Sequence, residues 1–224
     1  MGNASVSLGV NRPEALWLVG RPFFRALIRT FAPLRMYGNE RIPRHGPLVM
    51  CFNHFSWLDP WAIGTGIPRT VYYVAKQEAH DTPVMGWFIR LFGTTAVRRG
   101  ESDREAVRLM REIVGRGDAL GMFPEGTRQK REPGTVLPGA AMVAIQENVP
   151  VICAAIHGSQ DWRFGNFQPV SVAFGEPFVL DRHPRNSKGY RAGSTEIQQE
   201  LRRLWEFLVR IHELGRPRVA IPPP

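Results

Sequence analysis

The sequence predicts an α/β fold: a single domain with a largely parallel sheet flanked by helices, and an N-terminal basic amphipathic helix. Short continuous apolar runs alternate along the chain with longer stretches whose apolar residues recur every three or four positions. Strands that alternate with helices in this way favour a parallel sheet. A length of 224 residues suits one domain, and no internal repeat or compositional break divides the chain. We expect an N-terminal helix region at 1–34, the main domain at 35–214 and a flexible, Pro-rich tail at 215–224.

The first element is a helix expected over 13–31, because Pro13 suits a first helical turn. Arg21, Arg25 and Arg29 recur every four residues and share one face, while aromatic and aliphatic residues occupy much of the rest. A basic amphipathic helix with aromatic residues is typical of a membrane interface. The same pattern also fits a helix that covers the domain core and shows its arginines to water. Both interpretations stay open.

The elements that follow lead to the middle of the chain. Continuous apolar runs predict buried strands at 48–52 and 71–75, and a further strand is expected at 94–97. A helix is expected over 83–92. A capping-box pattern followed by apolar residues at helical spacing predicts another helix over 102–117.

The second half continues the alternation. Strands are expected at 119–123, 149–156 and 170–174, where apolar residues again run together. A helix over 139–146 separates the first two of these strands. A long final helix is expected over 193–214, because isoleucines and leucines follow one another along one side.

Composition and charge narrow the class of protein. Hydrophobic residues make up 43% of the chain and charged residues 22%, as in an ordinary globular protein. Cys51 and Cys153 lie inside apolar runs without metal-binding spacing, which favours reduced core residues and a reducing, intracellular compartment. No secretory signal is recognisable, and no uncharged apolar run reaches the roughly 18 residues that a membrane span needs.

The net charge points to an anionic partner. The 29 Lys and Arg against 20 Asp and Glu leave a formal charge of +9, which suits nucleic acid, an anionic bilayer or a phosphorylated substrate. No nucleic-acid-binding motif or basic low-complexity tail is present, so we expect no nucleic-acid partner. An anionic membrane surface and a phosphorylated substrate remain.

A histidine and an aspartate directly after the first predicted strand are the strongest candidates for catalysis. His54 and Asp59 lie close enough in the chain to share one turn. The carboxylate would then accept a hydrogen bond from one imidazole nitrogen, leaving the other free to take a proton from an alcohol. Taken alone, this spacing is common by chance, and a loop histidine beside a helix-capping aspartate is then the better interpretation. A metal site would need further ligands, and His45 and His80 do not have the spacing to supply them.

Two other segments also follow predicted strands. Phe123-Pro124-Glu125-Gly126-Thr127-Arg128 combines a glycine suited to a tight turn with an arginine that can pair with a phosphate or carboxylate. Arg98 and Arg99 end the strand at 94–97 and could clamp a phosphomonoester. Ligands gather beyond the carboxyl ends of strands in parallel α/β sheets, so the three segments can converge on one crevice. A surface turn and a solvated strand edge are the simpler readings of these two segments.

Taken together, these segments resemble the 1-acylglycerol-3-phosphate O-acyltransferase family, the glycerophospholipid acyltransferases. The likeness covers residues 35–180 and rests on ordered blocks: Asn53-His54-x-Ser56-x-x-Asp59, Gly93 to Gly100, Phe123 to Arg128, and Val149 to Cys153. Two positions depart from the family pattern. Ala96 stands where Pro or a bulky residue is frequent, and Cys153 replaces a second Pro.

The resemblance implies a role for each site residue. His54 is the general base and Asp59 orients it. The acceptor's glycerol phosphate is held by Arg98 or Arg99 together with Glu125, Gly126, Thr127 and Arg128. Supporting roles fall to Asn53, Ser56, Phe123 and Pro124.

The same resemblance implies the reaction and its partners. The 1-acylglycerol 3-phosphate hydroxyl attacks the thioester of acyl-CoA or of an acylated acyl carrier protein in one direct step, without a metal or other cofactor, giving phosphatidic acid. The enzyme is expected at the cytoplasmic face of the cell membrane as a peripheral protein. The alternatives are the same chemistry on glycerol 3-phosphate, another lysophospholipid, or a lipid-linked amino acid or sugar, and a non-catalytic basic binding domain.

Overall fold

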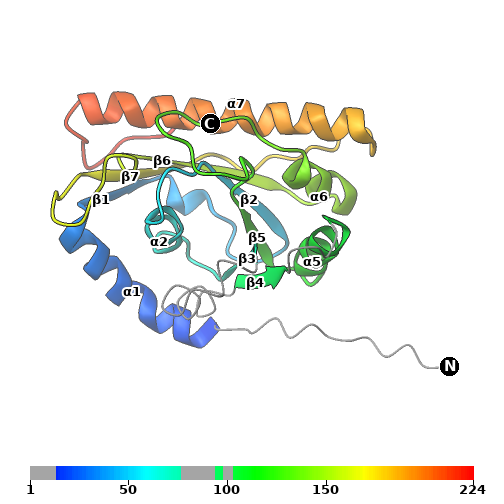
Figure 1. The fold of residues 1–224 in the computed structure, drawn as a ribbon, viewed down its shortest axis with the longest axis horizontal. Helices are drawn as coiled ribbons and strands as arrows, with labels where there is room; N and C mark the ends of the chain where they lie inside the picture. Colours follow the sequence, from blue (N-terminus) through cyan, green and yellow to red (C-terminus); the bar gives the residue numbers. More distant parts are fainter. Residues whose placement is uncertain (1–13, 77–93, 98–102) are drawn as a thin grey trace.

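The computed structural model describes residues 14–76, 94–97 and 103–224, which form a seven-stranded sheet with helices on both faces (Figure 1). The strand order is β1-β7-β6-β2-β5-β3-β4. The strands are β1 (Leu34–Tyr37), β2 (Leu48–Phe52), β3 (Val71–Lys76), β4 (Thr94–Val97), β5 (Ala119–Met122), β6 (Val151–His157) and β7 (Val170–Phe174). The helices are α1 (Glu14–Phe31), α2 (Asp59–Gly64), α5 (Asp103–Gly115), α6 (Gly139–Glu147) and α7 (Ser187–Glu213), with a short 3-10 helix, η1 (Asn39–Arg41).

The sheet is largely parallel, which confirms the predicted fold class. Five strands in a row, β6-β2-β5-β3-β4, pair in parallel. β7 pairs antiparallel with β6, and β1 pairs in parallel with β7. The carboxyl ends of β2, β5 and β6 therefore lie at the same edge of the sheet, where a ligand site is expected.

Two helical layers cover the sheet, and β2 and β7 are buried along their whole length, as their largely apolar sequences require. α5, α6 and α7 lie on one face, and α1 and α2 on the other (Figure 1). Along β2, Leu48, Met50 and Phe52 pack toward α2, whereas Val49 and Cys51 pack toward α6 and α7. Successive side chains of a strand point to opposite faces, so one short run supplies both cores.

The longest helix, α7, begins earlier than its sequence predicts. Its stripe Ile197, Leu201, Leu204, Leu208 and Ile211 is buried as expected. The helix nevertheless starts at Ser187, because the Asn186 side chain caps it by accepting hydrogen bonds from two backbone N–H groups.

The N-terminal helix forms over nearly the predicted residues, and its arginines are divided: Arg21 and Arg25 are half-buried, whereas Arg29 is exposed. Arg21 donates a hydrogen bond to the carbonyl oxygen of Ile67 at 2.5 Å, so it faces the domain and not water. The outward stripe is apolar: Val19, Phe23 and Leu27 are 76%, 68% and 44% exposed. Within the described part of the chain, none of the helices is long and apolar enough to cross a bilayer.

The C-terminal segment differs from the loose tail expected at 215–224. The guanidinium of Arg41 donates hydrogen bonds to the carbonyl oxygens of Pro222 and Pro223, at 3.0 and 2.9 Å. The hydroxyl of Tyr37 donates to the carbonyl oxygen of Pro217 at 2.8 Å. Proline lacks a backbone N–H but keeps its carbonyl acceptor, and these acceptors hold the segment against β1 and η1.

The two cysteines lie in the core of the sheet. Cys51 and Cys153 are free and buried and face each other across β2 and β6, as expected of core residues. Burial, followed by the neighbouring Cys51, raises the pKa of the Cys153 thiol well above its ordinary value. The helix predicted over 83–92 lies outside the described residues.

Candidate active site

The site is built around His54 and Asp59, in the turn that joins β2 to α2. Nδ1 of His54 lies 2.9 Å from Oδ2 of Asp59. The Asp59 side chain is fully buried, whereas that of His54 keeps 20% of its surface exposed. The predicted pairing of these two residues is therefore present in the structure.

Asp59 is held by the backbone of the same turn. Its Oδ2 also accepts hydrogen bonds from the backbone N–H groups of Phe55 and Ser56, at 2.6 and 2.7 Å. Three hydrogen bonds on this one oxygen fix the position of the carboxylate. Nδ1 of His54 then carries the proton that it shares with Asp59, which leaves Nε2 as a proton acceptor.

The loop after β5 supports the other side of the histidine. The ring of Phe123 lies against that of His54, with centroids 4.3 Å apart. The backbone N–H of Gln129 donates to the carbonyl oxygen of His54 at 2.7 Å. Together with the bond to Asp59, these contacts restrain both the backbone and the ring of the base.

Glu125 is a buried residue that connects the turn after β2 to the loop after β5. Its Oε2 accepts a hydrogen bond from the backbone N–H of His54 at 3.0 Å, and its Oε1 accepts one from the N–H of Gly134 at 2.8 Å. Burial raises the pKa of the Glu125 carboxyl above its ordinary value, although both N–H groups act in the opposite direction. Only 6% of Glu125 is exposed, so the carboxylate braces the site internally. Its predicted contact with substrate stays a prediction.

The supporting residues of the first motif have structural partners. Asn53 is fully buried and bonds β6 twice: its Nδ2 donates to the carbonyl oxygen of Ile156, and its Oδ1 accepts from the same residue's N–H. These bonds, of 3.1 and 2.8 Å, continue the pairing of β2 with β6 past the strand end. The hydroxyl of Ser56 accepts a bond from the N–H of Leu58 at 3.3 Å and so supports the turn before α2.

The remainder of the second loop faces outward. Gly126 has φ of +71°, a conformation that favours glycine. Thr127 and Arg128 follow it and are exposed. Pro124 is buried, and its carbonyl oxygen accepts a bond from the N–H of Leu137 at 2.9 Å, which closes the loop. The predicted contact of Arg128 with substrate stays a prediction.

The structure does not test every predicted site residue. Arg98 and Arg99 lie outside the described residues, although β4, the strand before them, runs parallel to β3 and ends at the edge where the site lies. The described part of the chain brings together no group of three or more His, Cys, Asp or Glu side chains that could hold a metal ion.

Two residues at the site were not predicted. Gly134 donates to Glu125 from a position that no sequence motif marks. Trp57, between His54 and Asp59 in the chain, is 51% exposed. A large aromatic side chain within a polar catalytic motif was the available signal for Trp57, whereas Gly134 is found only through its tertiary contact.

Comparison with known proteins agrees with this geometry. The model of the Acyltransferase family matches residues 33–157, more than half of the chain, including His54, Asp59 and Glu125. The 1-acyl-sn-glycerol-3-phosphate acyltransferase of Bacillus subtilis is 27% identical over 126 residues, which are 56% of this chain and 63% of that protein. The lyso-ornithine lipid O-acyltransferase of Pseudomonas aeruginosa is 30% identical over 168 residues, 74% of this chain and 62% of that protein.

A solved structure shares the fold. The crystal structure of the 1-acyl-sn-glycerophosphate acyltransferase of Thermotoga maritima matches with a TM-score of 0.62 at 23% identity, covering 85% of this chain and 82% of that one. The matched segments span somewhat less than two thirds of the lengths of the Bacillus and Pseudomonas relatives.

Proposed function

Because this chain belongs to the acyltransferase family, we propose that it transfers a fatty acyl group from a thioester to a lipid hydroxyl. The donor is acyl-CoA or an acylated acyl carrier protein. The acceptor is the free hydroxyl of 1-acylglycerol 3-phosphate, and the product is phosphatidic acid. Both donor and acceptor are substrates, and the proposal requires no metal or other cofactor.

The observation that carries this proposal is the His54–Asp59 pair, with Nδ1 and Oδ2 2.9 Å apart. Nε2 of His54 accepts the proton of the acceptor hydroxyl as its oxygen attacks the thioester carbonyl carbon. The new C–O bond forms, the C–S bond breaks, and the proton passes from His54 to the departing thiolate. The buried carboxylate of Asp59 stabilises the imidazolium that exists between these proton transfers.

The basic residues near the site favour a phosphorylated acceptor. Arg128 is exposed on the loop that also supplies Phe123 to the face of His54. Arg98 and Arg99 directly follow β4 in the sequence. Guanidinium groups bind phosphate oxygens in a bidentate manner. We therefore assign the acceptor's phosphate to Arg128 and to one of the two arginines after β4.

A second acceptor class has specific support. One relative is named a lyso-ornithine lipid O-acyltransferase, and its 30% identity exceeds the 27% of the Bacillus relative. The chemistry at His54 is the same for any lipid hydroxyl. A lipid-linked amino acid is therefore the alternative acceptor to 1-acylglycerol 3-phosphate.

The proposed location is the cytoplasmic face of the cell membrane, with peripheral attachment. Two features support attachment to a membrane surface. The chain carries a formal charge of +9, and α1 exposes the apolar side chains of Val19, Phe23 and Leu27. Cations attract anionic lipids, and exposed apolar side chains enter the interface.

An acyl-transfer assay tests the proposal. Free thiol released from acyl-CoA would be measured with 1-acylglycerol 3-phosphate, glycerol 3-phosphate, a zwitterionic lysophospholipid and lyso-ornithine lipid as acceptors. We expect the fastest release with 1-acylglycerol 3-phosphate and none above background for His54→Ala. Equal release by wild type and His54→Ala would exclude the mechanism, and a clear preference for lyso-ornithine lipid would change the acceptor.

A further inference from the structure

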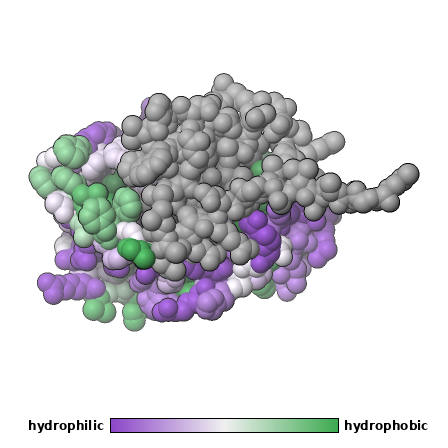
Figure 2. Space-filling view, turned by 90° about the horizontal axis from the view of Figure 1, so that it is seen from below, coloured by the Kyte–Doolittle hydropathy of each residue, from purple (hydrophilic) through white to green (hydrophobic). Residues whose placement is uncertain are grey.

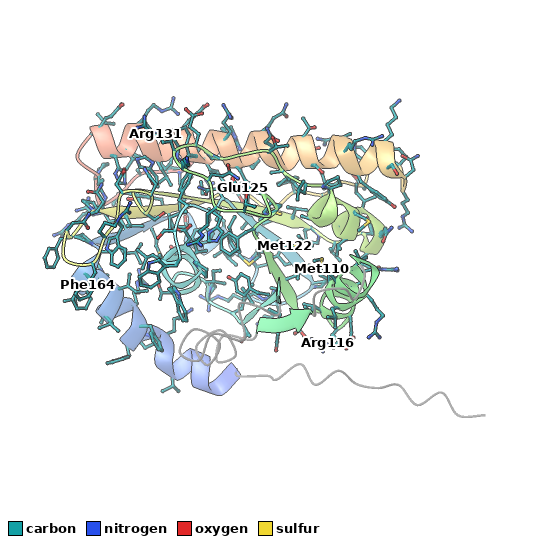
Figure 3. The ribbon with its side chains drawn as sticks, in the orientation of Figure 1. Met110, Arg116, Met122, Glu125, Arg131 and Phe164 are labelled. Carbon is teal, nitrogen blue, oxygen red and sulfur yellow. The ribbon has the colours of Figure 1, made fainter. Side chains whose placement is uncertain are left out.

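Aromatic side chains from three separate elements meet at one end of the molecule. Phe31 ends α1, Phe164 and Phe167 lie in the loop at 158–169 between β6 and β7, and Trp57 lies in the catalytic turn. Figure 3 shows Phe164 at this end, beside the C-terminal end of α1. These elements are distant in sequence, so their meeting is a product of the fold.

Trp162 connects the three elements. Its side chain is buried, with 5% of the residue exposed, and its Nε1 donates a hydrogen bond to the carbonyl oxygen of Phe31 at 3.1 Å. Its ring meets that of Trp57 edge-on at 5.4 Å. The rings of Phe31 and Phe164 lie 5.1 Å apart. The loop, the end of α1 and the catalytic turn are therefore packed as one unit.

The outer side of this unit is apolar and open. Phe164 is 77% exposed, Phe167 54% and Trp57 51%, and the stripe on α1 extends the same character along the helix. Figure 2 shows apolar side chains at the left of the molecule, the end where Figure 1 places α1. We call this set the aromatic surface; its members are Val19, Phe23, Leu27, Trp57, Phe164 and Phe167. Exposed apolar patches of this kind usually mark interaction sites.

The loop is built to keep its aromatic residues outward. The Asn166 side chain accepts hydrogen bonds from the N–H groups of Arg163 and Gln168, each 3.1 Å, and donates one to the carbonyl oxygen of Asp161 at 2.9 Å. The guanidinium of Arg163 donates to the carbonyl oxygen of Trp162 at 2.7 Å. Phe167 has φ of +50°, a conformation that a bulky residue rarely adopts. The hydrogen bonds within the loop thus hold a conformation in which Phe164 and Phe167 are exposed to water.

The charges around the aromatic surface indicate which partner covers it. Arg29 and Arg163 are exposed on the two elements that carry most of its members. Trp57 places the surface next to the base, where a lipid acceptor would have to enter. Aromatic residues bordered by arginines suit the headgroup region of an anionic bilayer.

From these contacts we propose that the β6–β7 loop and Trp57, together with the outer stripe of α1, insert into the interface of an anionic lipid bilayer. This second point of attachment, beside the one on α1, turns the His54 site toward the membrane. The inference rests on the proposed function, because it explains how a lipid hydroxyl reaches His54.

Vesicle binding tests the loop directly. The variant Phe164→Ser/Phe167→Ser would be sedimented with vesicles of phosphatidylcholine and phosphatidylglycerol in equal parts. We expect its partition onto the vesicles to weaken at least about tenfold, the scale for removing two large apolar side chains from an interface. The matched control is Val219→Ser/Ile221→Ser, because these residues are 85% and 81% exposed and flank Ala220, which packs on the side of the sheet that α6 and α7 cover. The control should bind like wild type.

A second measurement reports contact of the loop with the vesicles directly, so that misfolding of the double variant cannot be mistaken for lost binding. Cys51 and Cys153 are buried, so a cysteine at Phe164→Cys can be labelled selectively with a polarity-sensitive fluorophore. Its emission should shift to the blue on addition of the anionic vesicles. The same label at Val219→Cys should not respond.

Activity separates this inference from the proposed function. The Phe164→Ser/Phe167→Ser variant should lose transfer to a long-chain acceptor embedded in vesicles but keep transfer to a short-chain, monomeric acceptor. If wild type transfers no acyl group to any acceptor, the proposed function fails while vesicle binding still decides the role of the loop. Undiminished vesicle binding by a folded double variant overturns the inference. A dimer that forms without vesicles and dissociates in the double variant also overturns it, since a second copy then covers the surface.

Discussion

The backbone N–H of His54 donates a hydrogen bond to the side chain of Glu125, 71 residues further along the chain, at 3.0 Å. Because the other oxygen of Glu125 accepts from Gly134, one buried carboxylate ties the turn that carries the base to both ends of the loop after β5. The position of the base therefore depends on a residue that does not touch its imidazole.

Glu125→Gln tests this dependence. A glutamine presents one oxygen and one NH₂ group, so one of the two backbone donors loses its acceptor, at a cost of about 1–3 kcal/mol in unfolding free energy. We expect kcat to fall by about ten- to a hundredfold, since small displacements of a catalytic group cost that much, with little change in the KM of the acceptor. Glu132→Gln, exposed on the same loop, is the control. A rise in the acceptor's KM alone would instead support the contact with substrate that the sequence predicts.

The base and its partner should be separable from folding. His54→Ala is expected to lower turnover by about 10²–10⁴-fold, the usual contribution of a general base. Asp59→Asn keeps the volume but removes the charge that stabilises the imidazolium, so we expect a loss of similar size. Circular dichroism should show both variants folded, and steady-state thiol release measures the effect. Near-normal turnover by folded His54→Ala would remove the mechanism.

Direct transfer predicts that no acyl-enzyme accumulates. The hydroxyl of Ser56 accepts a hydrogen bond from Leu58, and Cys51 is fully buried, so neither is placed as a nucleophile. Intact-protein mass spectrometry after rapid mixing with acyl-CoA alone should show the unmodified mass. A stoichiometric adduct on either residue would contradict the one-step reaction.

Arginines near the site should discriminate between the two substrates. Arg128→Ala or Arg99→Ala is expected to raise the KM of a phosphorylated acceptor at least about tenfold, because charge-assisted bonds to phosphate are lost. The KM of acyl-CoA should change much less. Arg191→Ala, which removes an exposed arginine from α7, is the control for overall charge. An effect confined to acyl-CoA would move these arginines to the phosphates of the donor.

Stability should depend on pH through His212 in the last turn of α7. Burial, then the neighbouring His157 and Arg216, lower the pKa of His212 to about 4. The unfolded chain binds this proton near its ordinary pKa of about 6.5, so the folded state loses stability as pH falls from about 6.5 toward 4. Allowing for partial exposure, the loss is about 1–2 kcal/mol.

His212→Gln isolates that effect. Glutamine can keep a hydrogen bond to Ser171, which His212 now contacts at 3.0 Å, but it does not titrate. Urea unfolding near neutral pH and at about pH 5 should show a smaller loss for the variant than for wild type. The same pH dependence in both proteins would show that His212 does not contribute.

The local sequence predicts most strands of the sheet but misses β1 and the short helix α2. The strands predicted at 48–52, 94–97 and 170–174 coincide with β2, β4 and β7. β2 and β7 are buried along their whole length, which requires the largely apolar sequences that made them recognisable. β1 was not predicted, since Leu34–Tyr37 is an edge strand of only four residues and Arg35 interrupts its apolar sequence. Nor was α2, whose six residues are too few to show a helical period.

The start of α7 at Ser187 was also not predicted. Gly193 lowers the local helix propensity, so the predicted helix began only at that residue. A side chain at this position would come within 3.1 Å of Ala141 and 3.2 Å of Ile145. The glycine is therefore explained by the close approach of α6, which no local pattern reveals.

The catalytic pair was predictable because both residues lie in one turn. The bonds that position the pair were not, because Asn53, Glu125 and Trp162 find their partners more than 70 residues away. Sequence thus identifies the reacting groups and leaves their supports to the fold.

The antiparallel pairing of β6 with β7 has a further consequence. His157 pairs with Ser171 at the end of this hairpin, so the loop between them is anchored by its own two strands. Such a connection can change in length or sequence without altering the register of β2 and β5, on which the base depends. Exchange of the exposed residues 163–168, with Trp162 kept so that its contact with Trp57 in the catalytic turn persists, is expected to change vesicle binding and to leave the chemistry at His54 as it is.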